Sequence, residues 1–398
     1  MLHKANNDNL IHEGQYGGRP GCEAQSLTLL EELKYDLSYL TRRSLFNFDN
    51  DASSCYDRII VPLASVINRK YGMHRSIVAT HAKTLQEARF HLKTAVGISE
   101  LHYSHCTSFP IHGTGQGSGN SPCIWLFISS TLFDIHSSKA YGARFISPDG
   151  ALQVSFSMVG FVDDSTGSYN DFRPSAQATL STMFKNMEHD AQLWNDLLYC
   201  SGGKLELVKC SFHVLHFTFL PNGQPQPTIE KYDDMIHIID AETSQRIPIP
   251  AKRVFETHKT LGHQKSPLTN LPQEIRQLQQ KANRLAMLIA TSPISRSGAT
   301  LAYHSIYIPS IKYTLPQSFY TKKILDHAQA SSICYIIRKC GYNSNTARDI
   351  IYAPTEFAGG GFLPWYLLQG EGQIQQFIKH WRTDTIVEPN ASNAANGN

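Results

Sequence analysis

Two adjacent carboxylates, Asp163 and Asp164, are the side chains of this sequence best placed to do chemistry. They interrupt an apolar, strand-like run that ends at Val162, and the turn-forming residues 165–168 follow them. The pattern predicts a β-hairpin with both carboxylates at its tip. Because like charges repel, such a tip favours a bound divalent cation, and hard oxygen ligands beside a phosphate-bearing substrate indicate Mg2+. A solvated turn is the alternative interpretation, since turns favour Asp.

A third carboxylate, Asp51, lies at the end of another predicted strand. Residues alternate around Phe46 and Phe48, which predicts a strand that ends near Asp51 and then turns into a helix. Asp49 lies two residues earlier on the same face of this strand and is the alternative to Asp51. If the strand end meets the hairpin tip, the three carboxylates could hold two metal ions for in-line displacement at phosphorus.

Helical and strand-like segments surround these carboxylates. Leucines recur at helical spacing over 23–40, and 62–96 is also interpreted as helical, with a break at Gly72. A glycine-rich turn over 113–121 leads into an apolar helix that ends near His136. The elements expected after the hairpin are a helix over 175–199, a glycine turn into a strand carrying Lys209, short strands over 214–260 and helices from Gln273 onward.

Composition indicates a globular protein rather than a disordered or membrane-spanning one. Apolar residues make up 41% and charged residues 17% of the 398 residues, and no run approaches the ~20 apolar residues of a membrane span. The eight cysteines show no Cys-x-x-Cys pair, which predicts reduced thiols in an intracellular protein of the nucleus or cytoplasm. Residues 252–382 hold 16 Lys and Arg against 6 Asp and Glu, whereas the rest holds 20 against 27. An acidic part followed by a basic part suits a metal-dependent enzyme that acts on a polyanion.

Five sequence blocks occur in one order along the chain. They are Asp51, Gly113-x-x-Gln116-Gly117-x-x-x-Ser121-Pro122, Phe161-Val-Asp163-Asp164, Gly202-Gly-x-Leu…Lys209 and Leu261-Gly262. Their order and spacing resemble the reverse transcriptase domain of retrotransposons, particularly non-LTR elements, over about 15–262. The resemblance implies an α+β right-hand polymerase fold, with a palm of antiparallel sheet packed on helices, a helical thumb and fingers.

On this resemblance the chain divides into four parts. Residues 1–45 are expected to form partial fingers and 46–265 the palm, with a fingers insertion at about 62–112. Residues 266–385 are expected to form a helical thumb or connector, and 386–398 a disordered tail. Because only 14 residues precede the block that begins at Gln15, the fingers are expected to be truncated.

The resemblance also implies a catalytic site. Asp51, Asp163 and Asp164 match the aspartates that hold two Mg2+ ions (Mn2+ is a possible substitute) while a dNTP is added to a primer 3′-hydroxyl. Lys209 matches a lysine near the leaving pyrophosphate, where an ammonium can donate a proton.

Three further residues match substrate contacts of this family. Tyr56 matches the bulky residue that excludes a ribonucleotide 2′-hydroxyl, although a core aromatic is the alternative. Gln116 and Gly117 match residues that contact the incoming nucleotide and the template.

The implied function is RNA-directed DNA polymerase of a retroelement. Its partners would be an RNA or DNA template-primer duplex, dNTPs and further domains of a larger polyprotein, with no membrane. Two alternatives stay open. An RNA-templated RNA polymerase would use Asp57 against the ribose 2′-hydroxyl, and a catalytically impaired remnant would still bind nucleic acid with strong salt dependence.

Overall fold

The computed structural model describes residues 1–53, 55–106, 111–115, 117–147, 149–172, 179–229, 232, 235–268 and 271–383. The chain forms two compact units, an N-terminal unit (Met1–Glu256) and a C-terminal unit (Thr257–Asn398). The division lies before the palm boundary expected at 265. The tail expected to be disordered, 386–398, lies outside the described residues.

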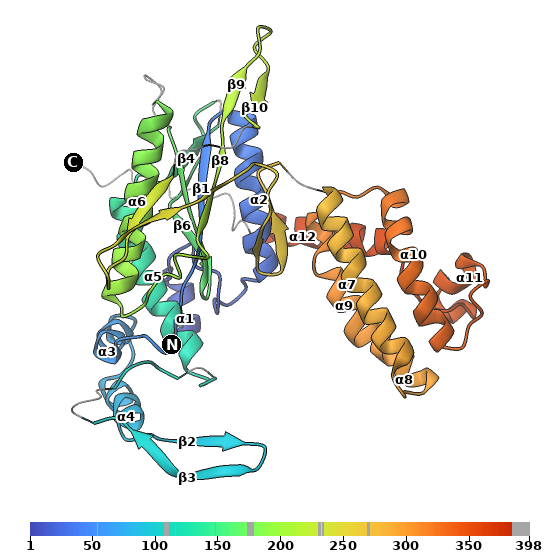
Figure 1. Ribbon diagram of the computed structural model, residues 1–398, viewed down its shortest axis with the longest axis horizontal. Coiled ribbons are helices and arrows are strands. Elements are labelled where there is room, and N and C mark those ends of the chain that lie inside the picture. Colours follow the sequence, from blue (N-terminus) through green and yellow to red (C-terminus); the bar gives the residue numbers. More distant parts are fainter. Residues whose placement is uncertain are drawn as a thin grey trace. The chain divides into compact units, whose positions relative to one another are not determined.

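A five-stranded sheet organises the N-terminal unit (Figure 1). Its strand order is β13-β8-β1-β7-β6, and all neighbours are antiparallel except β13 and β8. The central strand β1 (Leu45–Asp51) pairs with β7 on one side and β8 on the other. The other strands are β6 (Met158–Phe161), β7 (Asp164–Asn170), β8 (Ser211–Leu215) and β13 (Ala251–Lys252). The strand predicted around Phe46 and Phe48 is therefore confirmed.

The two faces of β1 differ in chemistry because successive side chains of a strand point to opposite faces. Phe46 and Phe48 are fully buried, in a core shared with residues of α5 (Ser121–Lys139) and α6 (Leu180–Cys200). The opposite face is polar and carries Asn47 and Asp49. There Lys34 of α2 (Ala24–Thr41) donates to Ser168, which donates to Asn47. Figure 1 shows α6 and α2 on opposite sides of the sheet.

The segment between β1 and α5 departs from the sequence prediction. Helices α3 (Val61–Lys70) and α4 (Arg75–Gln86) are confirmed on either side of Gly72. Residues 89–94, however, are strand β2 (Arg89–Thr94), which forms a hairpin with β3 (Gly97–Ser104). The helical interpretation was wrong there because polar and apolar residues alternate along this stretch, which favours a strand. Figure 1 shows this hairpin apart from the five-stranded sheet.

Short elements complete the N-terminal unit and include the strands predicted over 214–260. They are α1 (Leu2–Asn7), β4 (Ala143–Ile146), β5 (Gln153–Phe156), β9 (Phe217–Phe219), β10 (Pro225–Pro227), β11 (Ile236–Ile239) and β12 (Arg246–Ile249).

The C-terminal unit is a helical body with its own apolar core, preceded by one hairpin. Tyr303, Tyr307 and Trp365 are fully buried in this core. Tyr313 contacts the hairpin through a hydrogen bond to the carbonyl of Leu261 (2.8 Å). The elements are β14 (His258–Thr260), β15 (His263–Lys265), α7 (Leu271–Thr291), α8 (Arg296–Ala302), the π-helix η1 (Tyr303–Tyr307), α9 (Ile308–Lys312), the 3-10 helix η2 (Leu315–Gln317), α10 (Lys322–Lys339), α11 (Arg348–Tyr352), the 3-10 helix η3 (Thr355–Phe357) and α12 (Trp365–Thr383).

The architecture is a mixture of helix and sheet, so the α+β prediction is confirmed at that level. Across the part of the chain that the structure describes, no helix combines the length and the apolar character needed to span a membrane.

Candidate active site

The predicted hairpin is present between β6 and β7, but its turn comes earlier than predicted: residues 165–168 belong to strand β7, and of the two carboxylates only Asp163 lies in the loop. Phe161 pairs with Asp164, which leaves a two-residue loop of Val162 and Asp163. Val162 has a positive φ of 61°, as the first loop residue of a mirror-image hairpin turn must. A β-branched residue in this conformation is strained, so the surrounding structure must hold it in place.

Two contacts hold this turn. The indole Nε1 of Trp125, in α5, donates to the carbonyl of Val162 (2.6 Å). Gly17 packs so closely against the turn that a Cβ on it would lie 2.3 Å from the amide nitrogen of Val162. The sequence pattern gave no sign of either contact, because both join segments far apart in the chain.

The third predicted carboxylate lies opposite the hairpin. Asp51 and Asp164 are direct partners in the antiparallel pairing of β1 with β7. Directly opposite residues of such a pair project from the same face with their Cβ atoms about 4.5–5.5 Å apart. The strand end and the hairpin tip therefore meet, as the sequence predicted.

An open pocket of about 340 Å3 lies at this junction. Four of the predicted site residues line it, namely Asp51, Tyr56, Asp163 and Lys209, together with Ala52, Ser53, Cys55 and Asp57. Asp164 and Gly117 are described by the structure but do not line the pocket. Gln116 lies outside the described residues.

Lys209 lies in a turn just before β8, not in the strand where the sequence placed it. The amide of Lys209 donates to the carbonyl of Glu206 (2.8 Å), and this hydrogen bond closes the turn. The Lys209 ammonium lies 2.7 Å from Oδ2 of Asp51. This hydrogen bond raises the pKa of Lys209, so the group is a cation that contacts a pocket carboxylate.

Tyr56 and Cys55 are uncharged parts of the pocket wall. Burial, followed by the negative charge of Asp163, raises the pKa of the Cys55 thiol to about 12. Burial also raises the pKa of the Tyr56 phenol to about 12. The glycine-rich segment packs against this wall, because Thr114 donates its amide to the Tyr56 carbonyl (2.8 Å).

Asp49, the alternative to Asp51, is engaged elsewhere. Its carboxylate is buried, 3.2 Å from Nδ1 of His213, and accepts a long hydrogen bond from Thr166 (3.4 Å). The other ring nitrogen of His213 donates to the carbonyl of Glu256 (2.8 Å). Asp49 of β1 therefore contacts His213 of β8, and His213 in turn contacts the segment that follows β13. Asp51, by contrast, lines the pocket.

The donor atoms of the pocket suit a hard divalent cation, and the Asp51 carboxylate already contacts a cationic group. Within the described residues, however, no three His, Cys, Asp or Glu side chains are grouped closely enough to hold a metal ion by themselves. Mg2+ does not require three protein ligands, because it is commonly held by one or two carboxylates together with substrate phosphates and water. Asp51 and Asp163, which both line the pocket, could supply these carboxylates.

No protein-family model and no curated protein sequence matches the chain. Telomerase from Candida albicans, solved with the TWJ fragment of telomeric RNA, is similar at a TM-score of 0.37 and 13% identity, over 94% of this chain and 55% of that one. Telomerase from Candida tropicalis is similar at a TM-score of 0.38 and 13% identity, over 96% of this chain and 55% of that one. The chain thus spans about half the length of these telomerase chains, and similarity at such TM-scores does not establish a shared fold.

Proposed function

We propose that the chain is the palm and thumb of an RNA-directed DNA polymerase of a retroelement, which adds dNTPs to a primer 3′-hydroxyl. One observation carries the proposal: Asp51, at the end of β1, pairs with Asp164 beside the β6–β7 tip and shares one pocket with Asp163. Carboxylates from two separate strands meeting at an open pocket are suited to phosphoryl chemistry with divalent ions.

Each pocket side chain has a role in this proposal. Asp51 and Asp163 would hold Mg2+, which when bound neutralises the triphosphate and favours attack by the primer hydroxyl. Asp164 would support Asp51 from the neighbouring strand. Tyr56, a neutral phenol in the pocket wall, would exclude a ribose 2′-hydroxyl, and the protonated Lys209 would donate to the leaving pyrophosphate.

The C-terminal unit would act as the thumb and bind the template-primer duplex. Its helix α7 carries Arg276, Lys281 and Arg284, and basic side chains on one helix supply contacts to phosphates. Duplex binding should therefore weaken steeply with added salt.

The test is primer extension by the Asp163→Asn variant. The substitution keeps the shape of the side chain and removes its charge, so we expect extension to be abolished with little loss of duplex affinity. Asp149→Asn is the control, because Asp149 lies in the exposed turn between β4 and β5 and its variant should extend normally. Unchanged extension by Asp163→Asn would contradict the assignment.

A catalytically impaired nucleic-acid-binding protein is a second candidate. The 2.7 Å contact between Lys209 and Asp51 favours it, since an ammonium then occupies a lone pair that a metal ion would need. Such a protein would bind duplex with a strong salt dependence and add no nucleotide at any Mg2+ concentration. An RNA polymerase is the remaining alternative, because Asp57 lines the pocket and could contact a ribose 2′-hydroxyl. Such an enzyme would prefer rNTPs to dNTPs on the same primed RNA template.

A further inference from the structure

Two segments outside the helices and the sheet contribute to the pocket wall. The first, 52–58 (described except for residue 54), follows Asp51 and supplies five of the eight lining residues, and the second, 201–209, supplies Lys209. They run side by side: Ser53 donates its amide to the Lys204 carbonyl (2.8 Å), and Glu206 donates to the Asp51 carbonyl (2.9 Å). The relative position of Tyr56 and Lys209 depends on how firmly these two segments are held together.

One carboxylate outside the pocket joins the two segments. Oε1 of Glu242 accepts a hydrogen bond from Nη2 of Arg58 (2.5 Å), and its Oε2 accepts one from the ammonium of Lys204 (2.6 Å). Arg58 also donates Nε to the carbonyl of Gly202 (3.2 Å). Glu242 therefore binds one cation from each segment, and Arg58 links the first segment directly to the second.

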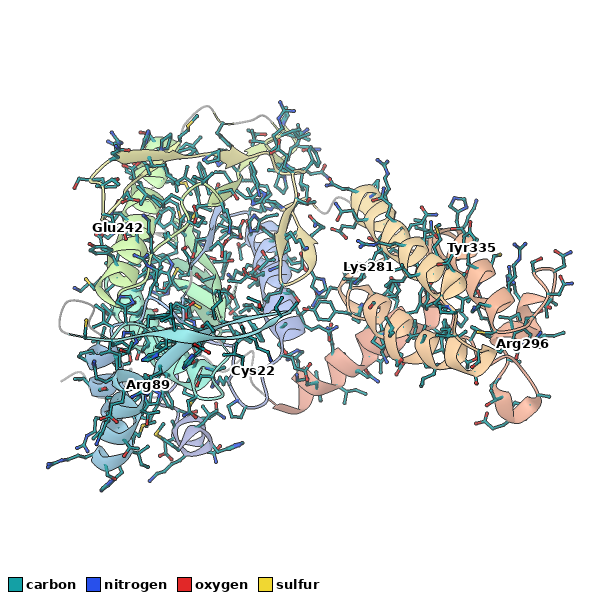
Figure 2. All side chains as sticks on the ribbon, turned by 60° about the horizontal axis from the view of Figure 1, so that its bottom comes forward. Cys22, Arg89, Glu242, Lys281, Arg296 and Tyr335 are labelled. Carbon is teal, nitrogen blue, oxygen red and sulfur yellow. The ribbon has the colours of Figure 1, made fainter. Side chains whose placement is uncertain are left out.

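The backbone around Glu242 fixes the position of its side chain. Asp240 is buried, and its Oδ1 accepts the amides of Glu242 (2.8 Å) and Thr243 (2.9 Å). The preceding strand β11 is tied to α6, because the carbonyl of Ile239 accepts from Asn195 (3.1 Å). Figure 2 shows Glu242 beside α6. The carboxylate is thus presented by a turn anchored on a long helix.

We propose that Glu242 is a positioning residue for the nucleotide site: it holds 52–58 against 201–209 and so sets Tyr56 relative to Lys209. The kinetic consequence of this inference rests on the proposed polymerase function, whereas the coupling of the two segments does not. Glu242 does not line the pocket. Solvent-exposed ion pairs contribute little to overall stability, so its removal should alter the site more than the folding of the chain.

The kinetic test compares Glu242→Ala with Glu188→Ala. Glu188 is the matched control, because its carboxylate also accepts from two separate elements, the His237 amide of β11 (2.8 Å) and Arg246 of β12 (3.4 Å), yet these contacts do not reach either pocket segment. A misplacement of about 1 Å can lower the rate up to about 100-fold, so we expect Glu242→Ala to lower kcat/KM for dNTP about tenfold. Because Lys209 would act on the leaving pyrophosphate, part of this loss should appear in kcat, whereas the duplex Kd should change less than about twofold. The control should leave kcat, KM and Kd unchanged.

A double-mutant cycle tests the route through Arg58. If Glu242 acts through Arg58, the Arg58→Ala/Glu242→Ala variant should be little worse than Arg58→Ala alone, whereas independent effects would multiply. An unchanged kcat/KM in Glu242→Ala, an equal loss in Glu188→Ala, or multiplying effects in the double variant would each overturn the proposal.

Hydrogen exchange separates this proposal from the polymerase assignment. The amides of Ser53 and Glu206 bridge the two segments, so Glu242→Ala should speed their exchange while Glu188→Ala should not. This readout needs no activity: faster exchange in a chain that extends no primer would support the coupling and refute the polymerase function. Unchanged exchange would overturn the coupling whatever the activity.

Discussion

Replacement of Gly202 by alanine should disturb the pocket wall and the folding of the N-terminal unit together. Gly202 has a φ of +93°, and a Cβ on it would lie 2.1 Å from the carbonyl oxygen of Arg58 and 2.8 Å from Cγ1 of Ile60. The first obstacle is backbone, which cannot move aside by a change of rotamer. The segments 52–58 and 201–209 would have to separate.

The structure offers a control that isolates this close contact. Gly72 has a similar φ of +89°, but nothing lies within 4 Å of its Cβ position. Alanine in a left-handed conformation costs about 1–2 kcal/mol at either position. Overpacking against a fixed neighbour adds about 1–3 kcal/mol, and only Gly202→Ala should carry this second cost.

The assay is urea unfolding followed by tryptophan fluorescence, to which Trp125 and Trp194 contribute from the N-terminal unit. Gly202→Ala should lower the free energy of unfolding by about 1–3 kcal/mol more than Gly72→Ala. Equal losses in the two variants would show that Gly202 does not approach Arg58 closely, and would refute the packing described for the pocket wall.

Three further predictions follow from buried polar groups. Asp49→Ala should destabilise the N-terminal unit by about 1–3 kcal/mol, because it removes the hydrogen-bond partner at Nδ1 of the buried His213. Asp51→Ala, at the more open pocket, should cost less in the same urea experiment, and equal costs would contradict the assignment. Trp125→Phe should cost about 1–2 kcal/mol and slow primer extension, because the Val162 carbonyl loses its indole donor; an unaltered extension rate would show that this contact does not hold the hairpin tip. In the C-terminal unit, burial, then Lys265 and Lys281, lowers the pKa of His263 from 6.5 to about 3. The unfolded chain therefore binds a proton that the folded chain does not, and stability should fall with decreasing pH from about 6.5 towards about 3, by up to about 1.4 kcal/mol per pH unit. His263→Phe should lack this component, and parallel pH profiles of the two proteins would contradict it.

The parts of the site that depend on local pattern could be predicted from the sequence. Alternation around Phe46 marked β1, and the acidic pair after an apolar run marked the hairpin, although the residues predicted as its turn, 165–168, belong to strand β7. The carboxylates at the ends of these elements stood out because an acidic pair at a strand end has no packing role.

The parts that depend on contacts between distant segments could not be predicted. The indole of Trp125 under the β6–β7 turn and the carboxylate of Glu242 between Arg58 and Lys204 have no counterpart in spacing or periodicity. The choice of Asp51 over Asp49 also needed the fold, since the two share one strand face and differ in what covers them.

The most direct test of the central claim is extension of a DNA primer on an RNA template by the purified chain, with dNTPs, with and without Mg2+. If the carboxylates of β1 and the β6–β7 tip form a metal-dependent nucleotidyl transfer site, the primer should lengthen only when Mg2+ is present and only with the template's complementary dNTP. A primer that stays unextended across all Mg2+ concentrations, although the duplex is bound, would contradict the claim.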